Sequence, residues 1–127
     1  MKVDYKPLPV SKVRSVVGQR RVKYRKIVWH TSELYIKTFL SLKEYSELTE
    51  SIIQYCCVDM GEPAYEMVDF ALRINIIASY AVIELPTDIE ELYYVAYESD
   101  LYDVVCANVN NAQINSVISF VNQYFWK

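Results

Sequence analysis

The side chains that could act as acids, bases, nucleophiles or metal ligands are few, and their spacing is poor for catalysis. The chain of 127 residues has one histidine, His30, and three cysteines, Cys56, Cys57 and Cys106. Cys–His chemistry needs the histidine beside a thiol, but all three cysteines fall within apolar helical patterns. A zinc site needs about four ligands, and the cysteines form no C-x-x-C pair. We therefore expect three buried, reduced thiols, an exposed histidine in a turn, and no metal site.

The carboxylates are numerous, but their spacing is typical of helix surfaces rather than of an acid–base site. Glu90 and Glu91 fall where a predicted helix begins, a position that favours negative charge. Two glycines cannot build a phosphate-binding loop, and neither common nucleotide-binding glycine motif occurs. We expect no enzymatic activity, no cofactor and no small-molecule substrate.

Basic residues gather near the start of the chain. The segment GQRRVKYRKIVW, residues 18–29, holds five of the thirteen Lys and Arg residues, although the net charge is −3. Residues 1–43 carry eleven bases and two acids, a formal charge of +9, and residues 44–127 carry two bases and fourteen acids, a charge of −12. This segregation predicts a charge dipole across the molecule.

The elements that position these residues change type at the same boundary. Two prolines in KPLPV (6–10) indicate an extended arm. Residues 20–29 and 34–39 alternate apolar and polar side chains around HTSE, which predicts a β-hairpin. In its first strand, we expect Val22 and Tyr24 to form the packing face and the bases to form the other.

The rest of the chain has helical spacing. Ser41 and Glu44 form a capping box before a helix to about residue 58, and residues 63–82 are apolar on all sides, which predicts a central helix. A second capping box, Thr87 to Glu90, precedes a helix to about Tyr97. Further helices are expected at 100–107 and at the C-terminus. The predicted fold is α+β and mostly α: a basic arm and hairpin (1–40) and an acidic body (41–127) of about five helices, in one compact domain.

The tyrosines and the charge dipole point to binding rather than to chemistry. Four tyrosines within residues 93–102 could form a docking face or line the edge of the core. The basic segment has three interpretations: it binds nucleic acid, it binds an acidic protein surface, on another copy for example, or it packs on its own helices. We favour protein binding, with these candidate partner-binding residues: Arg20, Arg21, Lys23, Tyr24, Arg25, Lys26, Trp29, Glu90, Glu91, Tyr94, Glu98, Asp100 and Asp103.

Part of the chain resembles a group of small tailed-bacteriophage proteins. The resemblance is carried by YIKTFLSLKEYSELTESII, VDFALRINIIASYAVIELPTDIEELY and SDLYDVV, within Leu34 to Tyr102. These segments are similar to tail-assembly chaperones and related virion components. The resemblance implies a non-enzymatic assembly or virion protein that binds phage proteins or itself, in the host cytoplasm, the virion or both. The alternatives are a nucleic-acid-binding module and a phage-encoded inhibitor of a host protein. No apolar run is long enough for a membrane helix, and no signal peptide is expected.

Overall fold

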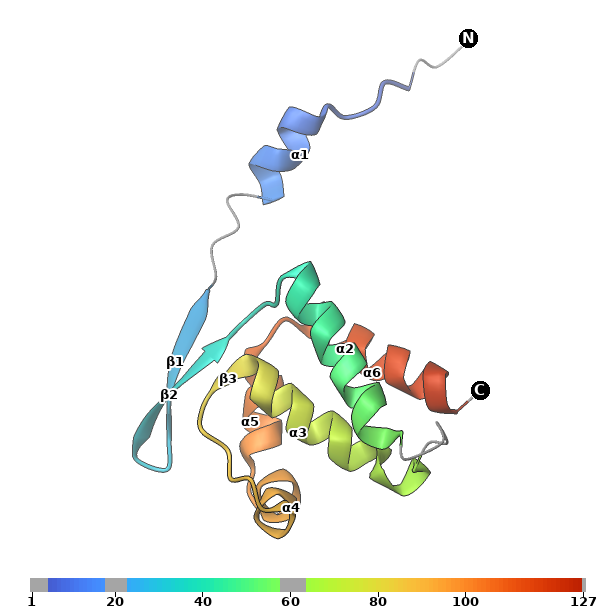
Figure 1. Ribbon diagram of the computed structural model, residues 1–127. Helices are drawn as coiled ribbons and strands as arrows, with labels where there is room; N and C mark the ends of the chain where they lie inside the picture. Colours follow the sequence, from blue (N-terminus) through green and yellow to red (C-terminus); the bar gives the residue numbers. More distant parts are fainter. Residues whose placement is uncertain (1–4, 18–22, 58–63, 127) are drawn as a thin grey trace.

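The computed structural model describes residues 5–17, 23–57 and 64–126. The described chain is mostly helical with a small antiparallel sheet (Figure 1), so the predicted α+β, mostly α class is confirmed. The elements, in chain order, are α1 (Val10–Val17), β1 (Tyr24–Trp29), β2 (Ser32–Lys37), α2 (Leu42–Cys56), the 3₁₀ helix η2 (Tyr65–Met67), α3 (Val68–Tyr80), β3 (Ala81–Val82), α4 (Ile89–Tyr97), α5 (Leu101–Asn108) and α6 (Asn111–Phe125).

The predicted hairpin is confirmed, with a shorter turn than HTSE. Trp29 pairs with Ser32, so His30 and Thr31 alone form the turn, and both have positive φ, 47° and 67°. Positive φ at both loop residues matches the right-handed twist of the flanking strands. At its open end the hairpin is closed by Thr38, whose backbone N–H donates to the Lys23 carbonyl at 2.9 Å.

The sheet has one covered face and one open face. Leu34 and Ile36 of β2 are buried in the main core, and Ile27 and Trp29 of β1 pack beside them. The opposite face of the sheet leaves Val28 and other alternate side chains exposed. The two-residue strand β3 pairs with β2 on the side away from β1, and it continues directly from α3, so the sheet is joined to the helical body.

The helix α2 begins as predicted. The Ser41 side chain accepts a hydrogen bond from the Glu44 N–H, and the Glu44 carboxylate accepts one from the Ser41 N–H. Lys37, at the end of β2, forms an ion pair with the same carboxylate. Glu44 therefore joins the sheet to the first turn of α2, and the Lys37 and Ser41 hydrogen bonds lower its pKa to about 2.

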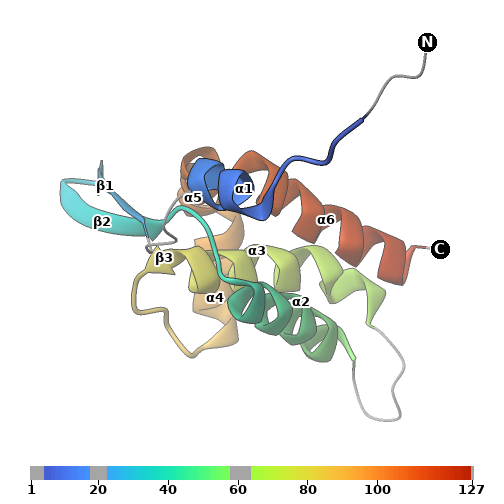
Figure 2. The ribbon, with the colours of Figure 1, turned by 90° about the horizontal axis from the view of Figure 1, so that it is seen from above.

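The predicted central apolar helix is α3. It packs against α2, α4, α5 and α6, and the figures show it between α2 and α5 (Figures 1 and 2). It ends at Tyr80, two residues before the predicted end, because the chain turns there into β3. Pro63, predicted in its first turn, lies outside the described residues, as does Val58, the predicted end of α2.

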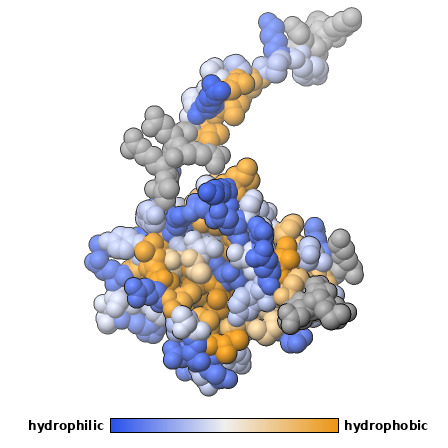
Figure 3. All heavy atoms as spheres, viewed as in Figure 1, coloured by the Kyte–Doolittle hydropathy of each residue, from blue (hydrophilic) through white to orange (hydrophobic). Residues whose placement is uncertain are grey.

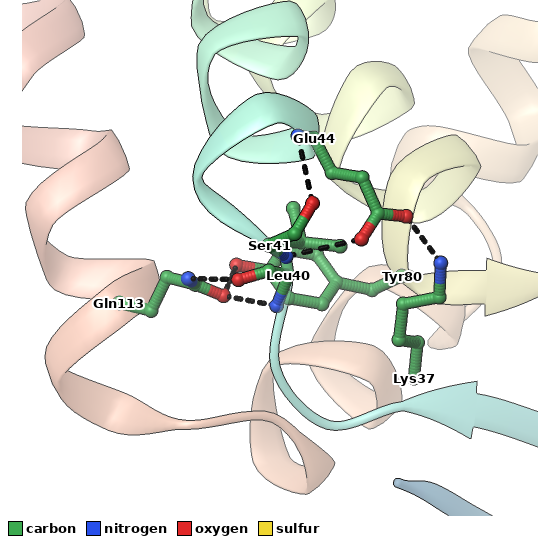
Figure 4. A network of polar contacts seen from close by, with 6 residues as sticks. All are labelled: Lys37, Leu40, Ser41, Glu44, Tyr80 and Gln113. Carbon is green, nitrogen blue, oxygen red and sulfur yellow. Dashed lines mark hydrogen bonds and ion pairs between the residues drawn. The ribbon is translucent and has the colours of Figure 1, made fainter. Parts of the chain in front are cut away.

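A partly buried polar network fixes α6 against the strand-to-helix turn (Figure 4). The Gln113 side chain donates to the Leu40 carbonyl at 3.0 Å and accepts from the Leu40 N–H at 2.8 Å. The hydroxyl of the fully buried Tyr80 donates to the same Gln113 oxygen at 2.8 Å. These bonds satisfy groups that would be costly to bury without partners. They hold α3, α6 and the start of α2 in one arrangement.

Two local predictions are wrong. The predicted N-cap of α4 is Thr87 with Glu90, but the observed N-cap is Asp88, whose carboxylate accepts from the Glu91 N–H at 3.2 Å. Both capping patterns fit this acid-rich sequence, and α4 begins one residue later than predicted. The arm was predicted to be extended, but residues Val10–Val17 form the helix α1. The Pro9 carbonyl accepts from the Lys12 and Val13 N–H groups at 3.0 and 3.3 Å, so the second proline starts a helix instead of preventing one.

Candidate protein-binding surfaces

Of the predicted basic contact residues, Lys23, Arg25 and Lys26 lie in the described part of the chain. Arg20 and Arg21 lie outside the described residues. Arg25 donates to the Asn108 side chain at 3.2 Å, and Lys26 pairs with Glu33 across the hairpin at 3.4 Å. Lys23 is exposed, and no described carboxylate pairs with it.

The predicted faces of the first strand are reversed. Arg25 pairs with the buried Ile36, and Tyr24 pairs with Lys37. Arg25 therefore lies on the side of the sheet that faces the helices, and Tyr24 is exposed on the other. The cause is that Ile27 and Trp29, at two-residue spacing from Arg25, supply the apolar side of the strand. Val22, predicted on the packing face with Tyr24, lies outside the described residues.

Two predicted partner-binding residues bind each other. The indole Nε1 of Trp29 donates to a carboxylate oxygen of Asp100 at 2.8 Å, and His30 Nε2 lies 3.6 Å from that oxygen. The Trp29 hydrogen bond is the main cause that lowers the pKa of Asp100, and His30 adds to it. The hairpin tip therefore contacts the acidic loop between α4 and α5 of its own chain. This is the self-packing interpretation, realised for these residues.

The other predicted acidic residues remain open to solvent. Glu90 and Glu91 are in the first turn of α4, Glu98 follows its last turn, and Asp103 is in the first turn of α5; all four are exposed. None of them forms an ion pair among the described residues. Their negative charge is thus available to a partner.

An aromatic groove runs beside these acids, between the start of α3 and the length of α4. Phe70, only 6% exposed, lies beneath Tyr93 and Tyr97, with ring centroids 6.5 and 6.3 Å away. Tyr93 and Tyr94 are 53% and 52% exposed, so these rings meet solvent although they pack on one another. The groove encloses about 570 Å³ and is lined by Glu66, Met67, Phe70, Ile89, Glu90, Tyr93, Tyr94 and Tyr97.

A charged cluster holds one wall of this aromatic groove. The Tyr97 hydroxyl donates to Asp69 at 2.6 Å, and Arg73 Nε donates to the same carboxylate oxygen at 3.0 Å. The Arg73 guanidinium lies 4.7 Å from the ring centroids of both Tyr97 and Tyr102, within the range of cation–π attraction. Burial, followed by the Asp69 interactions, raises the pKa of Tyr97 to about 12. These contacts tie the α4 wall of the groove to α3.

The helix α1 is the second exposed apolar feature. Val10, Val13 and Val17 recur at helical spacing on one side, and Val16 borders them. Every residue of α1 is exposed. The helix lies apart from the body (Figure 1), and in the space-filling view its apolar residues gather on one side (Figure 3).

The cysteines and the histidine do not form a catalytic group in the described residues. No hydrogen bond or ion pair joins His30 to a thiol there. Burial, with the neighbouring Cys57, raises the pKa of Cys56 to about 11, and burial raises that of Cys106; both shifts disfavour the nucleophilic thiolate. Cys56 is buried as predicted, whereas Cys57 and Cys106 are half-buried.

Two further observations concern sites and membranes. Across residues 5–17, 23–57 and 64–126, no three His, Cys, Asp or Glu side chains gather as metal ligands would. Over the same ranges, no helix combines the length and apolar character that a bilayer crossing requires.

The sequence interpretation missed the helix α1, and it named the tyrosines of the groove only as a possible docking face. Phe70, Met67 and Glu66 were assigned to the central helix without a surface role. The spacing of Val10, Val13 and Val17 carried the signal for α1, but the prolines next to it favoured an extended arm. Of the predicted residues, Glu90 and Tyr94 line the groove.

Comparison with protein-family models, curated proteins and solved structures found no match to this chain.

Proposed function

We propose that this chain is a non-enzymatic component of a protein assembly and that it binds through protein–protein contacts. The observation that carries the proposal is α1, an amphipathic helix on an arm with no buried residue. An exposed apolar stripe of this kind is typical of a surface that another protein covers.

The composition of α1 supports a bound role. A helix of eight residues is marginal in water by itself, and four valines and two serines give VSKVRSVV a low intrinsic helix propensity. Packing of its apolar side against another surface would provide the missing stability. An arm that gains its structure from a partner fits a component that is added to an assembly.

The strength of such a contact fits the same role. Full burial of a valine side chain contributes at least about 1.5 kcal/mol, so four fully buried valines would contribute about 6 kcal/mol or somewhat more. The ordering of side chains and the loss of translational and rotational freedom on association reduce this free energy. One arm alone would bind weakly, and several arms within one assembly would bind firmly through effective concentration.

The bacteriophage setting is a narrower part of the proposal. It rests on the resemblance of residues 34–102 to small tail-assembly and virion proteins. Neighbouring genes for capsid or tail proteins would support it, and neighbours of unrelated function would count against it.

Site-specific photo-cross-linking tests the proposal. A photo-reactive phenylalanine analogue is placed at Val13, on the apolar side of α1, or at Ser15, on its polar side, and the cells that naturally carry the gene are irradiated. The proposal predicts a discrete protein adduct from position 13 and little from position 15. Absence of a protein adduct at position 13, or equal adducts from both positions, would reject it.

Nucleic-acid binding is the second candidate. It is favoured by the exposed Tyr24 and by Lys12, Arg14 and Lys23, none of which pairs with a described carboxylate. This candidate predicts binding to single or double strands that weakens steeply with salt. Fluorescence-anisotropy titrations at low and moderate salt decide it, since an assembly protein would show no such salt-dependent binding.

A further inference from the structure

We infer that the partner surface of α1 is the aromatic groove on α3 and α4 of a second copy of this chain. The inference rests on the proposed function and extends it by naming the partner and the site. The two surfaces are the main unpartnered apolar features described above: a ridge of valines on the arm and a groove of tyrosines on the body.

The surfaces fit in chemistry. Phe70 forms the apolar floor of the groove, and Met67 and Ile89 add flexible and branched apolar side chains to its walls. A helix laid in a groove inserts side chains at three- and four-residue spacing, as Val10, Val13 and Val17 are spaced. The tyrosine rings offer broad contact area with few rotatable bonds and keep a polar tip for the rim.

The surfaces also fit in charge. The described arm, residues 5–17, carries Lys6, Lys12 and Arg14 and no acid. The groove lining contains Glu66 and Glu90 and no base, and Glu91 and Glu98 lie on the same helix or at its end. Opposite charges at the two rims would steer the arm to the groove and fix its register. Arg14 is three residues from Val17 and four from Val10, so it borders the valine side and would face a groove acid.

The chain's own arm is poorly placed to reach its own groove. Figure 1 shows α1 and α4 at opposite ends of the molecule, with α1 at the top and α4 at the bottom. Seven Cα steps join Val17 to Tyr24, a span of at most roughly 25 Å. Running back along the six residues of β1 to the hairpin tip would use roughly 17 Å of it. Only the short remainder of that span would be left to reach α4. The arm of a second copy is not limited by the length of this linker.

Complementation in solution tests the inference. Light scattering is measured for the unmodified chain, for Val13→Asp with a damaged arm, and for Tyr93→Ala with a damaged groove. We expect the unmodified chain to self-associate and each variant to weaken association by at least about tenfold, as loss of a central contact does. A mixture of the two variants should associate more than either alone, because one intact arm meets one intact groove. Ser15→Asp is the matched control, with the same charge change on the polar side of α1, and should associate almost normally.

Charge exchange provides a second test that leaves the apolar packing intact. Arg14→Glu and Glu90→Lys should each weaken association, and the double variant should recover at least part of it. Lys12→Glu, on the other side of α1, makes the same charge change as Arg14→Glu and should not be rescued by Glu90→Lys. Both Arg14 and Glu90 are exposed, so folding, checked by circular dichroism, should persist.

The outcomes separate this inference from the proposed function. A chain that stays monomeric at high concentration, or one that associates normally with Tyr93→Ala and Glu90→Lys, overturns the inference. If position 13 still cross-links to protein in that case, the proposed function stands with a different partner. If position 13 also fails to cross-link, both are wrong.

Discussion

The indole nitrogen of Trp29 donates a 2.8 Å hydrogen bond to the carboxylate of Asp100, across a sequence separation of 71 residues. This bond joins the basic hairpin to the acidic body within one molecule. The ion pair of Lys37 with Glu44 also joins the basic and acidic parts of the chain, so part of the charge dipole read from the sequence is satisfied internally. What remains for a partner is the arm before the hairpin and the acidic groove beside α4.

Replacing the tryptophan tests this internal contact. Trp29→Phe keeps an aromatic ring but removes the donor, so the pKa of Asp100 should rise towards its ordinary value because its main lowering cause is lost. Side-chain NMR titration of Asp100 measures the change. Thr31→Ser, in the same turn but without a bond to Asp100, is the control. An unchanged Asp100 titration in Trp29→Phe would contradict the contact.

The ion pair of Lys37 with Glu44 predicts a pH dependence of stability. The pKa of Glu44 falls from 4.5 to about 2 on folding. The contribution of Glu44 to the free energy of unfolding is therefore fully present above about pH 4.5 and is lost as the pH falls towards 2. The free energy of unfolding, from urea titrations across this interval, should decrease as the pH falls. Glu44→Gln should remove that part of the slope. Glu47→Gln, on the exposed surface of the same helix, should leave the slope unchanged, and equal slopes in all three proteins would refute the prediction.

The Gln113 network should contribute measurably to stability. Tyr80→Phe removes one hydrogen bond to Gln113 and should cost about 1 kcal/mol. Gln113→Ala leaves both backbone groups of Leu40 without their partner and should cost about 2–3 kcal/mol, because buried unpaired groups are costly. Chemical denaturation gives both values. Tyr45→Phe, which loses an exposed bond to Ser116, should cost less than Tyr80→Phe; the reverse order would be evidence against the network.

Tyr97 should titrate far above an ordinary tyrosine. Its pKa of about 12, against an ordinary value of 10, arises first from burial and then from the hydrogen bond to Asp69. Because folding raises the pKa of Tyr97, the contribution of its protonated hydroxyl to the free energy of unfolding is complete below about pH 10. That contribution is lost as the pH rises towards 12. Asp69→Asn should lower the pKa of Tyr97 but not restore 10, since burial remains. Ultraviolet titration of Tyr97→Phe against the unmodified chain isolates the signal, and a tyrosine titrating near 10 at this site would show that the groove wall is loose.

The sequence predicts the architecture better than it predicts the surface. The sequence locates the central helix because residues such as Ile76 and Ile77 make it apolar all round. A helix on the surface would carry polar residues on the side that faces solvent. The hairpin follows from alternation in Leu34 and Ile36. Alternation alone did not orient the first strand, because Tyr24 is as good a packing residue as Ile27 until the partner strand fixes the register. The groove could not be predicted, since the Phe70 ring meets Tyr93 and Tyr97 only after α3 and α4 pack together.

The most direct test of the account is hydrogen exchange across α1 in a dilution series. If the arm occupies the groove of a second copy, the backbone amides of α1 exchange rapidly in dilute solution, and they slow together with those of Tyr93–Tyr97 as the concentration rises. The amides of α6, which contributes no residue to the groove, should exchange at the same rate throughout. Exchange in α1 that is equally fast at every concentration, or equally slow at every concentration, would contradict an arm that another copy covers.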